Sequence, residues 1–133
     1  MKRVMVFGTF DILHPGHLYF LRAAKKLGDY LIVSLARDVN VRKIKGRKAL
    51  NSEKDRKQLI ESVKYINQAV LGSKHDYIKH IVSQKPDIIA LGYDQQAFTK
   101  NLKNRLAAAG LRVKVVRLKP YRSSQYKSSK ILS

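Results

Sequence analysis

Cysteine is absent from the 133-residue chain, so neither a disulfide framework nor a thiolate metal site can form. The sequence also lacks any run of about 18 apolar residues, the length that a membrane-spanning helix needs. The opening residues, MKRVMVFGTFD, carry a basic pair but reach glycine and aspartate too early for a signal peptide. These absences predict a cytoplasmic protein with no membrane partner.

Acidic residues are scarce. The chain has 9 Asp and Glu against 28 Lys and Arg, which gives a net charge of +19. Much of the excess lies in residues 37–48 and in residues 112–133. Such a balance points to an anionic partner: a nucleic acid, a membrane surface or a phosphate-rich small molecule. Charge alone does not choose among these, and a basic surface without a dedicated ligand has the same composition.

Hydrophobic residues make up 44% of the chain, as in an ordinary folded protein, and 133 residues suffice for one domain only. Apolar runs predict five short strands, at residues 4–7, 31–35, 69–71, 87–92 and 113–118. Apolar residues at helical spacing predict four helices, at residues 16–27, 52–63, 77–82 and 102–109. The basic stretch at residues 37–48 offers few core residues and is predicted to be a loop.

Strands that alternate with helices imply a parallel sheet covered on both faces, because each crossover forms a right-handed βαβ unit. The predicted fold is therefore α/β, a single doubly wound, Rossmann-like domain over residues 1–133 with a five-stranded parallel sheet. Folds of this kind bind ligands at the carboxyl ends of their strands. This rule directs attention to the segment that follows the first strand.

Residues 8–17 read GTFDILHPGH and lead from the first strand into the first helix. Gly8 permits a tight turn and the close approach of a ligand. Pro15 fixes the backbone before the helix, where unpaired amides favour an anion. His14 and His17 can donate hydrogen bonds to phosphate oxygens there. The alternative of a metal pair lacks a third ligand, so no protein-bound metal is predicted.

The complete string resembles the signature of the HxGH nucleotidyltransferases, a family that includes glycerol-3-phosphate cytidylyltransferases and archaeal FAD synthases. The resemblance covers nearly the whole chain. It implies that two histidines contact the nucleotide phosphates and stabilise the transition state, namely His14 and His17. It also implies nucleotide-binding roles for the rest of the string, with the aspartate organising the loop or a metal ion: Gly8, Thr9, Phe10, Asp11, Pro15 and Gly16.

Three further segments extend the resemblance. The family's phosphate-contacting lysine falls on Lys43 or Lys45, and the two remain unseparated. Arg56 occupies a position where family members also carry an arginine, although an exposed helix position is an equal alternative. Asp94, after the fourth predicted strand, corresponds to a ribose or base ligand and could otherwise cap the next helix.

The tail, residues 119–133, is expected to contribute to the nucleotide site. Ser128 and Ser129 resemble the family's hydroxyl-rich closing motif, although Lys127 replaces an expected serine or threonine. Tyr121 would pack on the nucleotide or on the core. Without the resemblance, this segment reads only as a basic, serine-rich terminus.

Two substrate pairs compete. Family members that act on glycerol-3-phosphate typically carry a tryptophan after the aspartate of the fourth-strand motif, and this chain has no tryptophan. The segments at residues 36–38, 45–48 and 93–96 look more like archaeal FAD synthases. The resemblance therefore implies AMP transfer from ATP to FMN, with CTP and glycerol-3-phosphate as the alternative pair. It also implies Mg²⁺ bound with the triphosphate, and a homodimer.

A function of another class is a basic nucleic-acid-binding module. The net charge of +19 and tyrosines near basic residues, such as Tyr121 and Tyr126, support it. It leaves residues 8–17 unexplained, and the chain has no recognisable DNA- or RNA-binding motif. Nucleic acid is therefore not the expected partner.

Overall fold

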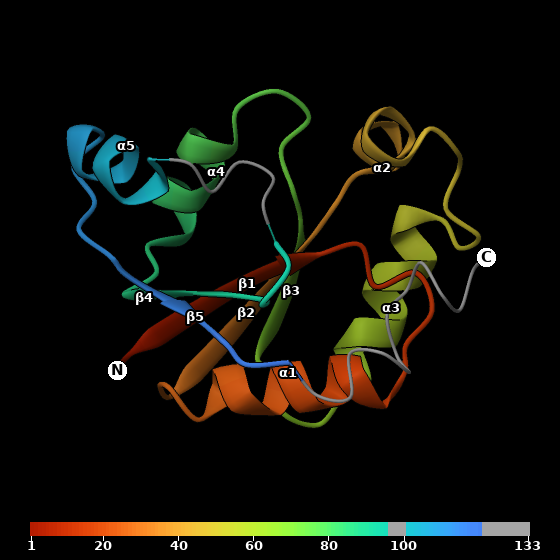
Figure 1. Ribbon diagram of the computed structural model, residues 1–133, viewed down its shortest axis with the longest axis horizontal. Helices are drawn as coiled ribbons and strands as arrows, with labels where there is room; N and C mark the ends of the chain where they lie inside the picture. Colours follow the sequence, from red (N-terminus) through yellow and green to blue (C-terminus); the bar gives the residue numbers. More distant parts are fainter. Residues whose placement is uncertain (96–100, 121–133) are drawn as a thin grey trace.

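A computed structural model describes residues 1–95 and 101–120 of the chain, and within them it shows one five-stranded parallel sheet (Figure 1). The strands are β1 (Arg3–Gly8), β2 (Tyr30–Leu35), β3 (Gln68–Leu71), β4 (Ile88–Leu91) and β5 (Lys114–Arg117). The helices are α1 (Pro15–Lys25), α2 (Asp38–Lys45), α3 (Glu53–Glu61), α4 (Tyr77–Gln84) and α5 (Leu102–Ala108). The predicted fold class is confirmed.

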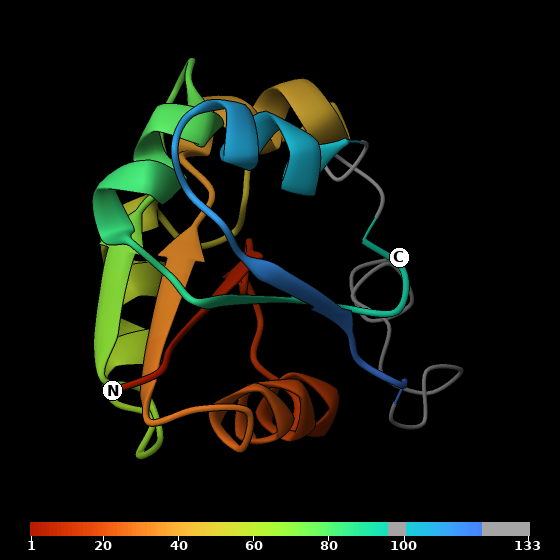
Figure 2. The same cartoon turned by 90° about the vertical axis from the view of Figure 1, so that its left-hand side faces the viewer.

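Both faces of the sheet are covered, which is why its central strands are apolar throughout. On one face, β1 and β2 pack against Leu21 and Ala24 of α1 and Ile60 of α3. On the other, they pack against Ile81 of α4 and Leu106 of α5. Figures 1 and 2 show the two helix layers on opposite sides of the strands. A sheet buried on both faces requires continuous apolar runs, and this explains why those runs predicted the strands well.

The strand order is β3-β2-β1-β4-β5. β2 and β3 are added on one side of β1 and the last two strands on the other, so the strand order reverses between β1 and β4. β1 pairs with β2 over its full length, with Gly8 beside Leu35 at the carboxyl end. In doubly wound sheets, the crevice at such a reversal is the usual ligand site. Gly8, the last residue of β1 and the first of the signature segment, therefore lies beside this crevice.

The basic stretch does not form a loop, and that prediction is wrong. Residues 38–45 form the helix α2, which ends at Gly46 in the left-handed conformation (φ 71°). Only Val41 of this helix is buried, so the apolar periodicity on which the prediction depended is nearly absent. The helix is stabilised at its ends instead, by Asp38 in the first turn and by basic residues in the last turn.

Two apolar side chains that belong to the helical spacing of the predicted helices at residues 16–27 and 52–63 lie at the surface. Leu59 is 46% exposed, whereas its neighbour Ile60 is fully buried. Neighbouring helix residues point about 100° apart, so a short helix on a sheet buries only one of the two. Leu18 is 38% exposed. Within the part of the chain described here, every helix is too short or too polar to cross a bilayer.

Candidate active site

The two signature histidines lie together where α1 begins. His14 is the N-cap of the helix and Pro15 is its first residue, one position before the predicted start at residue 16. The imidazole rings of His14 and His17 stack, with centroids 3.7 Å apart and planes 20° from parallel. The Nδ1 atom of His14 accepts a long hydrogen bond of 3.4 Å from the backbone N–H of His17. The rings therefore act as one unit at the positive end of a helix.

Both imidazoles have lowered pKa values, which favours their neutral forms at pH 7. Burial lowers the pKa of His14. Burial also lowers the pKa of His17 to about 4; the charges of His14 and Lys45 act in the same direction, while the nearby backbone of Ile12 opposes them. Nothing in residues 1–95 and 101–120 hydrogen-bonds to the buried Nδ1 atom of His17. A buried polar atom without a partner is unfavourable, so this nitrogen favours a ligand that supplies one.

The lowered pKa of His17 predicts a pH-dependent stability. Between about 4 and the ordinary value of 6.5, the unfolded chain binds a proton at this residue and the folded chain does not. The contribution of His17 to the free energy of unfolding is therefore complete above pH 6.5. It is lost as the pH falls to 4, and the loss reaches about 3 kcal/mol. Urea unfolding of the wild type and His17→Gln at pH 7 and pH 4.5 measures it. The wild type should lose more stability; equal losses would contradict the prediction, and His75→Gln is the control.

The first half of the signature segment faces inward. Phe10 has a positive φ of 51° and is only 5% exposed, inside the core on the α1 side of the sheet. Thr9 accepts a hydrogen bond through its backbone carbonyl from the guanidinium of Arg56. Gly8 has no positive φ; a Cβ atom there would lie 2.6 Å from the Phe10 ring. The turn predicted to need Gly8 thus places its left-handed residue at Phe10 instead.

Asp11 organises a loop, which was one of the two roles that the sequence left open. The residue is buried, with 5% of its surface exposed. Its carboxylate accepts hydrogen bonds from the backbone N–H groups of Leu50 (2.7 Å) and Asn51 (2.8 Å). The Asn51 side chain donates back to the Asp11 carbonyl. No group of three acidic or histidine side chains in the described ranges could hold a metal ion. The carboxylate thus joins the signature segment to the loop that follows α2.

The two lysines of α2 that were candidates for phosphate contact differ in their electrostatic surroundings. Burial and the charge of Arg47 lower the pKa of Lys45, while the carboxylate of Asp11 raises it. The same lysine lowers the pKa of His17, so the Lys45 ammonium lies within electrostatic reach of that imidazole. Lys43 lies two residues earlier and leaves the helix about 200° away around its axis. Of the two, Lys45 is the one whose charge acts on His17.

Arg56 is not the exposed helix residue that was one of the two alternatives for it. It is fully buried, and its guanidinium donates to the carbonyls of Thr9 (3.0 Å) and Asn51 (3.1 Å) and pairs with Asp38 (2.7 Å). Burial alone would raise the pKa of Asp38, but hydrogen bonds from Arg56 and the Glu53 amide outweigh it and lower the value. Arg56 therefore connects the signature segment with both α2 and α3.

The carboxyl end of β4 contributes a different residue from the one expected. Asp94 is exposed in a turn after the strand, and the N-cap of α5 is Asn101, so the capping alternative for Asp94 is wrong. Gln95 bridges the two strands at the crevice: its amide donates to the Phe7 carbonyl (2.9 Å) and accepts from the Gly92 N–H (2.8 Å). No sequence signal identifies this role, because both partners are backbone atoms.

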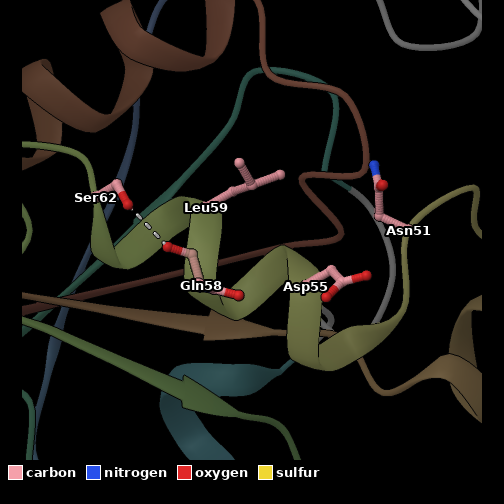
Figure 3. A pocket seen from close by; sticks show the side chains of 5 residues that line it. All are labelled: Asn51, Asp55, Gln58, Leu59 and Ser62. Atoms are coloured by element: carbon pink, nitrogen blue, oxygen red, sulfur yellow. Dashed lines mark hydrogen bonds between the residues drawn. The ribbon is translucent and has the colours of Figure 1, made fainter.

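Three predicted site residues, Tyr121, Ser128 and Ser129, lie outside the described residues. A separate hollow of about 330 Å³ lies along α3, lined by Asn51, Asp55, Gln58, Leu59 and Ser62 (Figure 3). Its lining contains none of the predicted site residues. It meets the site only through Asn51, which holds the Asp11 loop.

The doubly wound fold and the imidazole pair beside its crevice together define a nucleotidyltransferase-type enzyme. The chain belongs to the cytidylyltransferase-like family, whose model matches residues 5–133. It is 49% identical over 124 residues to the FAD synthase of Aciduliprofundum boonei, covering 93% of this chain and 83% of that protein. It is 43% identical to the FAD synthase of Pyrococcus abyssi, covering 98% and 89%.

A solved structure agrees with this assignment. The crystal structure of the lipopolysaccharide core biosynthesis protein from Thermoplasma volcanium has 43% sequence identity and a TM-score of 0.86. The match covers 91% of this chain and 98% of that one. The resemblance seen in residues 8–17 thus extends to both the sequence and the fold of the domain.

Proposed function

We propose that this protein is an FMN adenylyltransferase, which transfers AMP from ATP to FMN and releases pyrophosphate. The observation that carries the proposal is the stacked imidazole pair at the start of α1, beside the crevice between β1 and β4. The similarity to proteins named FAD synthase, at 42–49% identity over most of the chain, supports the choice of substrates.

The reaction is an in-line substitution at phosphorus. A phosphate oxygen of FMN forms a bond to the α-phosphorus of ATP, and the bond to the oxygen that bridges to the β-phosphate breaks. That oxygen leaves with the electron pair as part of pyrophosphate. Positioning and charge stabilisation supply the catalysis in such reactions. His14 and His17 donate hydrogen bonds to the transferred phosphoryl group, and Lys45 stabilises the departing pyrophosphate.

The metal ion enters with the substrate in this proposal. The described residues contain no cluster that could hold a resident metal ion, and magnesium commonly binds through phosphate oxygens and water. The substrate is therefore the Mg²⁺ complex of ATP. We expect the reaction to take place in the cytoplasm, to use the tail residues Tyr121, Ser128 and Ser129 at the triphosphate, and to be carried out by a homodimer.

The direct test is a matrix of two acceptors and two nucleotides. FMN or glycerol-3-phosphate is incubated with ATP or CTP in the presence of Mg²⁺, and pyrophosphate and the joined product are measured. FMN with ATP should give FAD and pyrophosphate in equal amounts. Turnover only with glycerol-3-phosphate and CTP would replace the proposed substrates. No turnover with any pair, together with salt-dependent binding of plain duplex DNA, would favour the nucleic-acid-binding alternative.

The two α2 lysines should differ in this assay. Lys45→Met removes a cation that acts on the site and should lower kcat/KM for ATP by about 10- to 100-fold, the range for one hydrogen bond to a charged group. Lys43→Met removes the same charge from another face of α2 and should change it by less than about threefold. Steady-state kinetics on the two variants measure the difference. Equal losses would show that only the net charge of α2 matters.

A further inference from the structure

The geometry points to Phe10 as a positioning residue that holds the His17 imidazole, and to Gly8 as the residue that leaves room for the Phe10 ring. This differs from a nucleotide-binding role for Phe10 and from a ligand-approach role for Gly8. The inference uses the proposed transfer reaction for its kinetic test, and a second test that is independent of any substrate.

Phe10 is placed to support His17 from the interior. Its ring and the His17 ring meet edge to face, with centroids 5.3 Å apart and planes at 70°. At 5% exposure, it is packed in the core among residues that include Val6 and Leu21. A side chain so enclosed cannot move freely, and an aromatic edge against an imidazole fixes the orientation of that ring. His17 in turn stacks on His14, so one contact orients both rings.

The backbone at Phe10 is also held by its surroundings. A φ of 51° lies in the left-handed region, which residues other than glycine, asparagine and aspartate rarely adopt. The neighbours on both sides are fixed by hydrogen bonds, through the Thr9 carbonyl to Arg56 and through the Asp11 carboxylate to Leu50 and Asn51. This conformation turns the Phe10 side chain toward the core instead of the crevice. An unfavourable conformation that persists at a functional site commonly serves the function.

Gly8 completes the arrangement. A Cβ atom at Gly8 would lie 2.6 Å from Cε2 and 2.8 Å from Cζ of Phe10, closer than real Cβ contacts come. Gly8 has no positive φ, and its backbone pairs regularly beside Leu35. The backbone conformation therefore does not require glycine here, whereas the Phe10 ring does. Alanine at this position must push the ring, and the ring must push His17.

The kinetic test is a double-mutant cycle with Gly8→Ala and Phe10→Leu. Gly8→Ala should lower kcat by about 10- to 100-fold with little change in KM for ATP. The reason is that a catalytic side chain displaced by about 1 Å, here the His17 imidazole, can lose about that much in rate. Phe10→Leu should lower kcat by about tenfold, since it removes the edge contact but keeps an apolar side chain. In the double variant, the smaller leucine accommodates the new methyl group. The kcat of the double variant should therefore lie within about threefold of the kcat of Phe10→Leu alone.

A ligand-approach role for Gly8 gives the opposite result. The methyl group would then block the nucleotide in either background, so the two losses would multiply and KM for ATP would rise. That outcome overturns the inference. If Gly8→Ala does not fold while the double variant does, the rescue itself supports the contact. If neither folds, Phe10→Leu decides alone, and an unchanged kcat overturns the inference.

The second test observes His17 without any substrate. The imidazole carbon-bound protons of His17 are followed by NMR through a pH titration of the wild type and Phe10→Leu. Because Phe10 encloses the ring, Phe10→Leu should move the proton shifts of His17 and raise its pKa toward 6.5, while the nearby charges of His14 and Lys45 are unchanged. An unmoved spectrum overturns the inference. If the wild type makes no FAD but the His17 spectrum still differs between wild type and Phe10→Leu as expected, only the proposed function is refuted.

Gly28→Ala is the matched control. A Cβ atom at Gly28 would lie 2.8 Å from both the Lys2 carbonyl oxygen and the Cγ2 atom of Val4, a clash of similar severity away from the site. It should lower the melting temperature without changing kcat for the folded fraction. A loss of kcat in Gly28→Ala as large as that in Gly8→Ala would show that strain in the sheet accounts for both, and would overturn the positioning role.

Discussion

His17→Ala lowers the turnover number for FAD formation by at least about a hundredfold, the loss typical of removing one donor to a developing charge. Burial is the main cause that lowers the pKa of His17 to about 4. His17 is therefore a neutral donor held in a place of low polarity, where one hydrogen bond to a phosphate is worth more than in water. kcat and kcat/KM should fall together, because the interaction forms with the reacting phosphate.

The folded state should tolerate this change. The Nδ1 atom of His17 has no partner among the described residues, so alanine removes an unfavourable buried group along with the ring. We expect the free energy of unfolding at pH 7 to change by less than about 1 kcal/mol. His75→Ala, at an exposed histidine in the turn before α4, is the control and should keep full turnover. A His17→Ala enzyme with wild-type turnover would remove His17 from the chemistry.

The sequence predicts the fold well because the sheet is buried on both faces. Continuous apolar runs are then needed in every central strand, and all five predicted strands overlap the observed ones. α2 was missed because a helix with one buried residue, Val41, has no periodicity to detect. Its determinants are its ends, namely Asp38 in the first turn and Gly46 after the last. Such signals are short and are easily outweighed by a run of basic residues.

The candidate site likewise has one part that the sequence predicts and one part that it does not. The signature segment could be read from the sequence, and the structure places His14 and His17 in contact as expected. The residues that hold this segment could not, because their partners are distant in the sequence and mostly backbone atoms. Gln95 bonds to the backbone of Phe7 in β1 and of Gly92 just after β4, and Arg56 bonds to two carbonyls. An arginine in a helix gives no sign, by itself, that it is buried.

Arg56→Met should destabilise the folded protein by about 3–5 kcal/mol, because it removes a fully buried guanidinium that donates three hydrogen bonds. Methionine fills a similar volume, so the loss comes from polar groups and not from a cavity. The carbonyls of Thr9 and Asn51 lose their donor, at about 1–3 kcal/mol for each one that stays buried. The carboxylate of Asp38 is 47% exposed and can turn to water, which limits its share. Urea unfolding at pH 7 measures the total.

Lys57→Met, at the next residue of α3, separates this effect from the loss of any one positive charge. Lys57 pairs with Glu61 at 3.1 Å on the surface, with side chains 34% and 50% exposed. A pair of that kind contributes at most about 0.5 kcal/mol, so the two neighbouring substitutions should differ about sixfold or more in effect. Similar effects would mean that Arg56 is reached by water in solution. Its three hydrogen bonds would then not be what joins the signature segment to α2 and α3.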